Sequence, residues 1–210
     1  MVIKLQKLIV ASVLAASSCF ASATLINPLD QFDPGSFNIN PNVTNWGRGW
    51  QFSVNADDVW VTQLGLITPT TGNYSLSLFD VSAHTEIASI DNLSGGNSWE
   101  FFDIAPIELS NGSNYIVELF GIGTNAYYFS TAFTEPTGTI DYVDMKYCNS
   151  CAPGTYPTNT LQGYMYGIPD ISYQIGAPTN QVPEPSILAL VGMGLAGAGF
   201  VRRRKQQAQA

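Results

Sequence analysis

Between residues 24 and 181 the chain repeatedly alternates apolar and polar side chains, and this period of two constrains the fold most strongly. The alternation runs through four segments: Trp50–Val54, Val59–Leu66, Tyr74–Phe79 and Tyr115–Phe120. Because successive side chains of a strand point to opposite faces, each run predicts a half-buried strand. Turn-forming clusters at 70–73, 94–97 and 110–113 separate the runs. No long stretch has helical period, so we expect an all-β domain, an antiparallel β-sandwich or jelly roll.

Both ends of the chain have the composition of targeting segments. At the N-terminus, Lys4 and Lys7 precede an apolar stretch, and Ala21-Ser22-Ala23 provides small residues for cleavage. This order predicts a signal peptide at 1–23, so the rest of the chain is expected to be exported.

The C-terminus combines three features in a fixed order. Val182-Pro183-Glu184-Pro185, within a linker at 179–185, leads into an uncharged stretch at 186–201, which is followed by Arg202-Arg203-Arg204-Lys205. Sixteen helical residues reach about 24 Å, short of the roughly 30 Å hydrocarbon core of a bilayer, which suits a temporary transmembrane helix. The cations predict that the tail at 202–210 is cytoplasmic.

This tail resembles the PEP-CTERM sorting signal of Gram-negative bacteria that make extracellular polysaccharide. The resemblance implies handling by exosortase, a membrane protease, and a transient stay in the inner membrane. The expected destination is the cell surface or the extracellular matrix. The body, over roughly 47–173, is similar to an uncharacterised β-sandwich domain common in such proteins, which has no agreed activity.

We predict one domain at 24–178, a length sufficient for one hydrophobic core. The net charge of this domain limits the kinds of partner that it can bind. Residues 24–181 hold fifteen acids and two basic residues, Arg48 and Lys146, so their formal charge is −13. Such a surface repels phosphate backbones, so no nucleic-acid partner is expected. Neutral sugars and divalent cations are compatible partners; solubility alone also explains the charge.

Side chains with distinctive chemistry are few in this domain. His84, in a predicted hairpin loop, is the only histidine, which excludes a three-histidine zinc site. Cys19 leaves with the signal peptide, so Cys148 and Cys151 remain. We expect them to form a structural disulfide in a long loop between Met145 and Gln162, with a redox pair as the alternative.

Carboxylates are the only plentiful reactive groups, so an enzyme of this kind would be a glycosidase or lyase with an acid pair. The candidate acids are Asp57 with Asp58, Glu100 with Asp103, Asp141 with Asp144, and Asp170. The sequence assigns no two of them to one cleft, and no catalytic residue is expected. Asp57 and Asp58 are interpreted as turn residues, with a structural calcium site as the alternative. No other cofactor is expected.

Aromatic rings are the natural candidates for stacking on sugars. Trp50 and Trp60 lie in alternating strands and are expected to pack between the sheets. Trp46, in a predicted loop, and Tyr164 with Tyr166 are the candidates for exposed stacking.

The sequence thus predicts an exported β-sandwich that binds or structures extracellular polysaccharide without catalysis. A carbohydrate-active enzyme that uses paired carboxylates is one alternative, and a purely structural surface protein is another.

Overall fold

The computed structural model describes residues 24–29, 32–131 and 133–178. Within them lie one short 3-10 helix, η1 (Pro34–Ser36), and ten strands: β1 (Asn38–Val54), β2 (Val59–Leu66), β3 (Tyr74–Asp80), β4 (Thr85–Leu93), β5 (Glu100–Leu109), β6 (Asn114–Ser130), β7 (Ile140–Asn149), β8 (Asn159–Leu161), β9 (Met165–Tyr166) and β10 (Pro169–Ile175). The four predicted strands lie within β1, β2, β3 and β6, and the all-β prediction is confirmed.

The predicted targeting segments lie outside the described residues. They are the signal peptide at 1–23, the linker at 179–185, the membrane span at 186–201 and the basic tail at 202–210. Within the described part of the chain, no helix is long and apolar enough to cross a membrane. The described residues belong to one compact unit that ends at Pro178.

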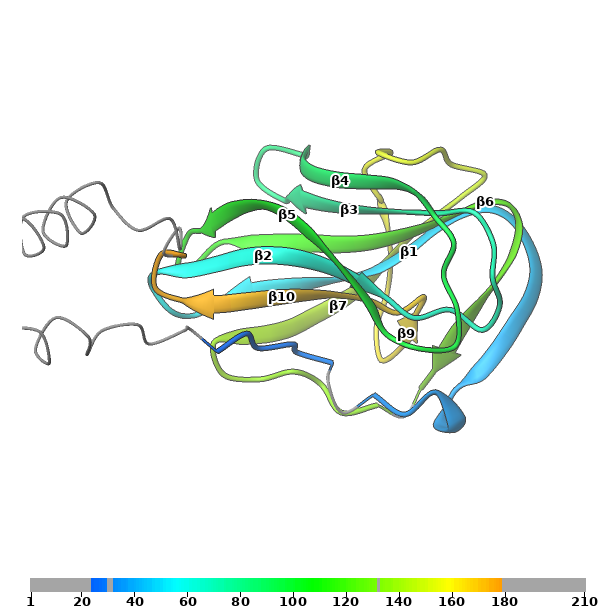
Figure 1. The fold of residues 1–210 in the computed structure, drawn as a ribbon, viewed down its shortest axis with the longest axis horizontal. Coiled ribbons are helices and arrows are strands. Elements are labelled where there is room, and N and C mark those ends of the chain that lie inside the picture. The colour runs from blue at the N-terminus through cyan, green and yellow to red at the C-terminus, as the bar shows by residue number, and fades with distance from the viewer. Residues whose placement is uncertain (1–23, 30–31, 132, 179–210) are drawn as a thin grey trace, which may run out of the picture. The chain divides into compact units, whose positions relative to one another are not determined.

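The strands form two antiparallel sheets. The large sheet has the order β4-β3-β6-β1-β7-β8, with β9 paired to β6, and the small sheet has the order β10-β2-β5. Figure 1 shows β2, β5 and β10 in front of β1, β6 and β7. The jelly-roll connectivity stays a prediction.

One hydrophobic core unites the two sheets, and the alternation along β2 shows how. Val59, Val61 and Leu64 are fully buried and belong to this core. Trp60 alternates with Val59 and Val61, so it lies on the other face of β2, half-buried and outside the core cluster. The expectation that Trp60 packs between the sheets is therefore wrong, whereas Trp50 is fully buried in the core.

A second, smaller cluster covers the other face of the large sheet. Phe79, Ile116, Phe120 and Cys148 form it, and Tyr156 of the connection between β7 and β8 packs against it. The Tyr156 ring meets the Phe79 ring edge-on, with centroids 5.6 Å apart. This connection therefore lies over the outer face of the sheet, and β3 is buried on both of its faces.

The predicted disulfide between Cys148 and Cys151 is present, with Cα atoms 5.9 Å apart. Its setting differs from the prediction, because Cys148 lies in strand β7 and the loop spans only 150–158. The bridge therefore closes the start of the loop that covers the second cluster.

Candidate functional site

The structure contradicts the expectation that Trp46 is exposed. Residues 45–49 continue β1 instead of forming a loop, and the positive φ of Asn45 marks an irregularity within the strand. Trp46 has no exposed surface, and its ring packs 4.9 Å from that of Tyr127. Gly121 makes room for the ring, since a Cβ there would lie 2.4 Å from a Trp46 carbon. Trp46 is a core residue.

Tyr164 and Tyr166 are half-buried neighbours whose ring centroids lie 5.4 Å apart. Tyr166 also packs against the rings of Tyr127 and Phe129, so much of its surface serves the core. With Trp46 buried, the three residues do not form one stacking surface. A role of the two tyrosines in sugar binding stays a prediction.

Asp57 and Asp58 are exposed in the turn between β1 and β2, as a turn interpretation requires. Asp57 Oδ1 accepts a hydrogen bond of 3.1 Å from Asn111 Nδ2. Among the described residues, no group of three or more His, Cys, Asp or Glu side chains could hold a metal ion. The structure therefore gathers no further carboxylate around this calcium candidate.

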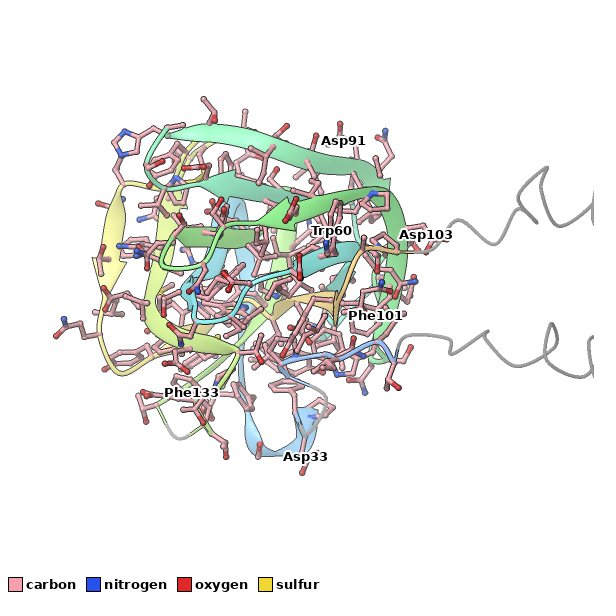
Figure 2. The ribbon with its side chains drawn as sticks, turned by 90° about the vertical axis from the view of Figure 1, so that its left-hand side faces the viewer. Asp33, Trp60, Asp91, Phe101, Asp103 and Phe133 are labelled. Atoms are coloured by element: carbon pink, nitrogen blue, oxygen red, sulfur yellow. A yellow bond between two sulfur atoms is a disulfide. The ribbon has the colours of Figure 1, made fainter. Side chains whose placement is uncertain are left out.

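A different place, here called the η1 hollow, is a half-open cavity beside η1. Its volume is about 520 Å³. Its walls come from three segments: Pro28, Leu29, Phe32, Asp33, Ser36 and Phe37 around η1; Phe133, Thr134, Glu135 and Pro136 between β6 and β7; and Met165 of β9. Figure 2 shows Asp33 and Phe133 on separate segments at the lower end of the view.

Backbone hydrogen bonds hold the η1 side of the hollow against the small sheet. Ile26 exchanges two such bonds with Tyr173 of β10, and Leu29 N donates to Asp170 Oδ2 at 3.0 Å. The chain then turns through η1, whose first turn is capped by Asp33 Oδ1, the acceptor for Gly35 N at 2.9 Å.

The opposite side of the hollow belongs to the connection between β6 and β7. Pro136 O accepts a hydrogen bond from Tyr142 N at 2.9 Å, and Asp141 Oδ1 accepts one from Gly138 N at 2.6 Å. The Phe133 ring packs edge-on against Tyr142, with centroids 5.1 Å apart. The segment that carries Phe133 and Glu135 is therefore tied to β7.

The aromatic walls rest on core side chains. The ring centroids of Phe32 and Phe37 lie 4.3 Å apart. The Phe32 ring also meets the rings of Trp99 and Tyr128 edge-on, with centroids 6.0 Å apart in each pair.

Tyr142, which supports the Phe133 ring, has a raised pKa. Burial, with smaller contributions from Asp144 and Glu135, raises the pKa of Tyr142 far above its usual value. Tyr142 therefore stays protonated, and its hydroxyl donates to Tyr164 O at 2.7 Å.

The η1 hollow thus combines apolar rings with hydrogen-bonding groups. Its carboxylates, Asp33 and Glu135, accept hydrogen bonds, and its hydroxyls, on Ser36 and Thr134, both donate and accept them. No residue of the hollow was singled out from the sequence. A shared local pattern could have drawn attention to them, because Phe32-Asp33-Pro34 and Phe133-Thr134-Glu135-Pro136 each place an aromatic ring, an acid and a proline together.

Glu118 is the other unusual polar group, fully buried on the outer face of the large sheet. Its Oε1 lies 3.7 Å from Cys148 Sγ, but a disulfide sulfur carries no proton to donate. Oε2 has no hydrogen-bond partner among the described residues. Burial raises the pKa of this carboxyl well above its usual range, against a lowering effect of Arg48. The Glu118 side chain has no exposed surface with which it could contact a ligand.

The C-terminal tail matches the family model of the PEP-CTERM protein-sorting motif over residues 181–205. The resemblance inferred from Val182 to Lys205 is thereby confirmed. The chain carries a signal that implies processing by exosortase and sorting to the cell surface in Gram-negative bacteria. No curated protein sequence matches the chain.

Two solved structures resemble the described fold at a distance. The cysteine protease and lectin-like domains of Cwp84, a surface layer associated protein of Clostridium difficile, match with a TM-score of 0.44 and 9% identity, over 63% of this chain and 33% of that one. A variant of the clostridial cysteine protease Cwp84 after propeptide cleavage matches with a TM-score of 0.47 and 8% identity, over 76% and 42%. This chain thus spans less than half of either relative, and neither likeness bears on function.

Proposed function

We propose that this exosortase-sorted surface protein binds a neutral extracellular polysaccharide in the η1 hollow without altering it chemically. One observation carries the proposal, namely the grouping of three phenylalanine rings and two carboxylates around a single hollow of about 520 Å³. Small-ligand sites in proteins have volumes of roughly 300–1,000 Å³ and combine apolar walls with a few polar groups.

The chemistry of the walls suits a sugar ring. Each pyranose has an apolar face of C–H groups, which packs on an aromatic ring and removes apolar surface from water. Its hydroxyls donate hydrogen bonds to carboxylates, and bonds to a charged acceptor are stronger than neutral ones. Phe32, Phe37 and Phe133 supply the rings, and Asp33 and Glu135 supply the acceptors.

Charge selects neutral glycans over anionic ones. The two carboxylates of the η1 hollow, together with the formal charge of −13 on residues 24–181, repel uronates and sulfated sugars. A bridging divalent cation would be needed to bind an anionic chain. The proposed ligand is therefore a neutral polysaccharide that binds without added calcium.

The test is affinity electrophoresis of the full chain, extracted in nonionic detergent, through gels that contain the neutral polysaccharide of its own bacterium. The Phe133→Ala variant should bind about five- to tenfold more weakly, because it loses one stacking ring. Phe101→Ala is the matched control. Phe101 is another half-buried phenylalanine, whose ring lies over Gly65 on the small sheet, outside the η1 hollow.

Each gel is run with calcium and with a chelator. Retardation that persists with chelator, weakens in Phe133→Ala and stays within about twofold of wild type in Phe101→Ala supports the proposal. The proposal would be contradicted if both variants lost retardation equally, or if the protein were retarded only in the presence of calcium. No retardation of a folded protein would favour a purely structural surface protein.

A carbohydrate-active enzyme remains the second candidate, because Asp33 and Glu135 line the same hollow. Glycosidases use two carboxylates that flank the scissile bond. Asp33 already uses one oxygen to cap η1, which favours a structural role for it. Release of reducing ends from the polysaccharide distinguishes the candidates. We expect none, whereas release that disappears in Glu135→Gln would establish the enzyme.

A further inference from the structure

An apolar groove opens along the side of the molecule where one strand of each sheet ends the strand order. Ile87 and Ile90 of β4 line it on one side, and Ile104 and Ile107 of β5 line it on the other. Its volume is about 320 Å³. We call it the β4–β5 groove. The four isoleucines are partly buried and pack against the main core.

Both strands that border the groove are edge strands among the described residues. β4 pairs only with β3, and β5 pairs only with β2. A free strand edge presents unpaired N–H and C=O groups that can bind another extended segment. On β5 this edge is interrupted, because Pro106 lacks an N–H and the register with β2 shifts between Asp103 and Ile107. β4 also shifts register against β3, at two places, but it contains no proline, so every residue of its edge keeps a backbone N–H. β4 is for that reason the edge proposed to pair.

The surroundings of the groove are acidic. Asp103 lines it, while Asp91 follows Ile90 and Glu108 follows Ile107 in the chain. Figure 2 labels Asp91 on β4 and Asp103 on β5. The only basic residues between 24 and 178 are Arg48, which is buried in β1, and Lys146 of β7, which donates to Thr160 Oγ1. No cation of the described domain compensates these carboxylates.

We propose that the β4–β5 groove binds an extended segment of a partner protein that alternates aliphatic and basic side chains. The segment pairs antiparallel or parallel with β4 through its backbone. Its aliphatic side chains cover the isoleucines, since alternate side chains of a strand point the same way. Its lysines or arginines lie toward Asp91 and Asp103 and steer association.

The same observations argue against two other occupants. A second copy of this chain would place its own acids against Asp91, Asp103 and Glu108, and like charges directly opposed across strands are destabilising. A glycan would find no aromatic ring among the lining residues of the groove. The groove is thus separate in chemistry and in place from the η1 hollow, and its role does not depend on the proposed sugar binding.

The probe is a fluorescent heptapeptide of alternating lysine and valine, titrated into the full chain in nonionic detergent and followed by anisotropy. Two control peptides are matched to it, one with glutamate in place of lysine and one with proline in place of the central valine. We expect saturable binding of the lysine peptide alone, because glutamate reverses the charge and proline removes a backbone donor. Binding should weaken at high salt.

Two variants locate the peptide. Ala105→Phe fills the groove from an exposed position on β5 and should reduce affinity more than tenfold. Asp91→Asn combined with Asp103→Asn should reduce it about fivefold, since two exposed charge pairs are lost. Asn at 103 retains the acceptor for Gln63 Nε2, which donates to Asp103 Oδ1 at 2.8 Å. Asp144→Asn removes one carboxylate from β7, which pairs with neither β4 nor β5, and should leave affinity unchanged.

Hydrogen exchange gives a readout that needs no variant, because a paired segment should protect backbone amides of β4. The proposal is overturned by absence of binding, by equal binding of the glutamate peptide, or by affinity that survives Ala105→Phe. It is also overturned if the chain is a dimer that Ala105→Phe dissociates, because a second copy would then occupy the groove. Loss of sugar binding in Phe133→Ala has no bearing on this outcome.

Discussion

At the scale of single residues, Glu118 shows how a buried charge depends on its surroundings. It lies between Ser77 of β3 and Gly49 of β1 in the sheet register, where its carboxyl has no hydrogen-bond donor to compensate burial. An ionised carboxylate without such donors is costly in a protein interior, so burial raises the pKa of this group well above its usual range. Folding therefore holds a proton on Glu118 that the unfolded chain releases at lower pH.

The pH dependence of stability follows from this raised pKa. Below the unfolded pKa of about 4.5 the carboxyl is neutral in both states, so its burial costs least there. As the pH rises from there toward the folded pKa, the unfolded state gains a charge that the folded state lacks, and stability falls.

We therefore expect Glu118→Gln to flatten the fall in stability above pH 4.5. The gap between variant and wild type should widen in favour of the variant by up to about 1.4 kcal/mol per pH unit in that window. Urea unfolding of both proteins from pH 5 to 8 measures it. A difference that stays constant across this range would contradict a raised pKa, whatever its absolute size.

At the scale of elements, the 150–158 connection depends on a disulfide and one aromatic anchor. Cys148, next to the last residue of β7, belongs to the second cluster. Cys151 packs on the same cluster, and Tyr156 packs on Phe79. The His84 ring of the β3–β4 hairpin also meets the Tyr156 ring, 4.6 Å away. Few apolar contacts hold the connection against the sheet, so we expect the disulfide to be needed to keep it in this position.

Replacing both cysteines by serine should lower the free energy of unfolding by about 2 kcal/mol, the chain-entropy value for so short a loop. Faster hydrogen exchange should be confined to the connection and its neighbours on β3 and β6. Treating wild type with a reductant serves as the control and should reproduce both effects. Unchanged stability and exchange in the variant would show that the disulfide is dispensable to the fold.

The elements also show what the sequence could and could not predict. Alternation of apolar and polar side chains identified the end of β1, β2, β3 and the start of β6. The alternation did not predict that the polar positions of β3 and β6, such as Ser77 and Glu118, are buried as well. The first half of β1 was missed, since Pro41, Asn45 and the glycines at 47 and 49 are typical of loops. Long-range pairing with β6 overrides these local preferences, and it carries Trp46 into the core.

At the scale of the whole molecule, the two proposed sites depend on contacts between distant parts of the chain. The η1 hollow needs the segment before β1, the β6–β7 connection and β9, and no periodic pattern relates these three. The β4–β5 groove exists only because the last strand of one sheet lies beside the last strand of the other. The sorting tail, by contrast, is continuous in sequence and was identified without any structure.

The whole chain combines a sorting signal at its C-terminus with a proposed binding site in its folded domain. The PEP-CTERM tail is a signal that implies sorting to the cell surface, and the η1 hollow is proposed to hold the chain there on neutral polysaccharide. The same proposal assigns to the acidic domain charge the repulsion of anionic polymers. Sugar binding in the η1 hollow is the central claim.

The most direct test of this claim is hydrogen exchange of the full chain with and without its own neutral polysaccharide, read out along the whole sequence. The account predicts new protection in two separate segments, around η1 at 28–37 and in the β6–β7 connection at 133–136. The same experiment on Phe133→Ala should show that protection reduced in both segments together. Protection located elsewhere, or none at a saturating concentration of polysaccharide, would contradict the account.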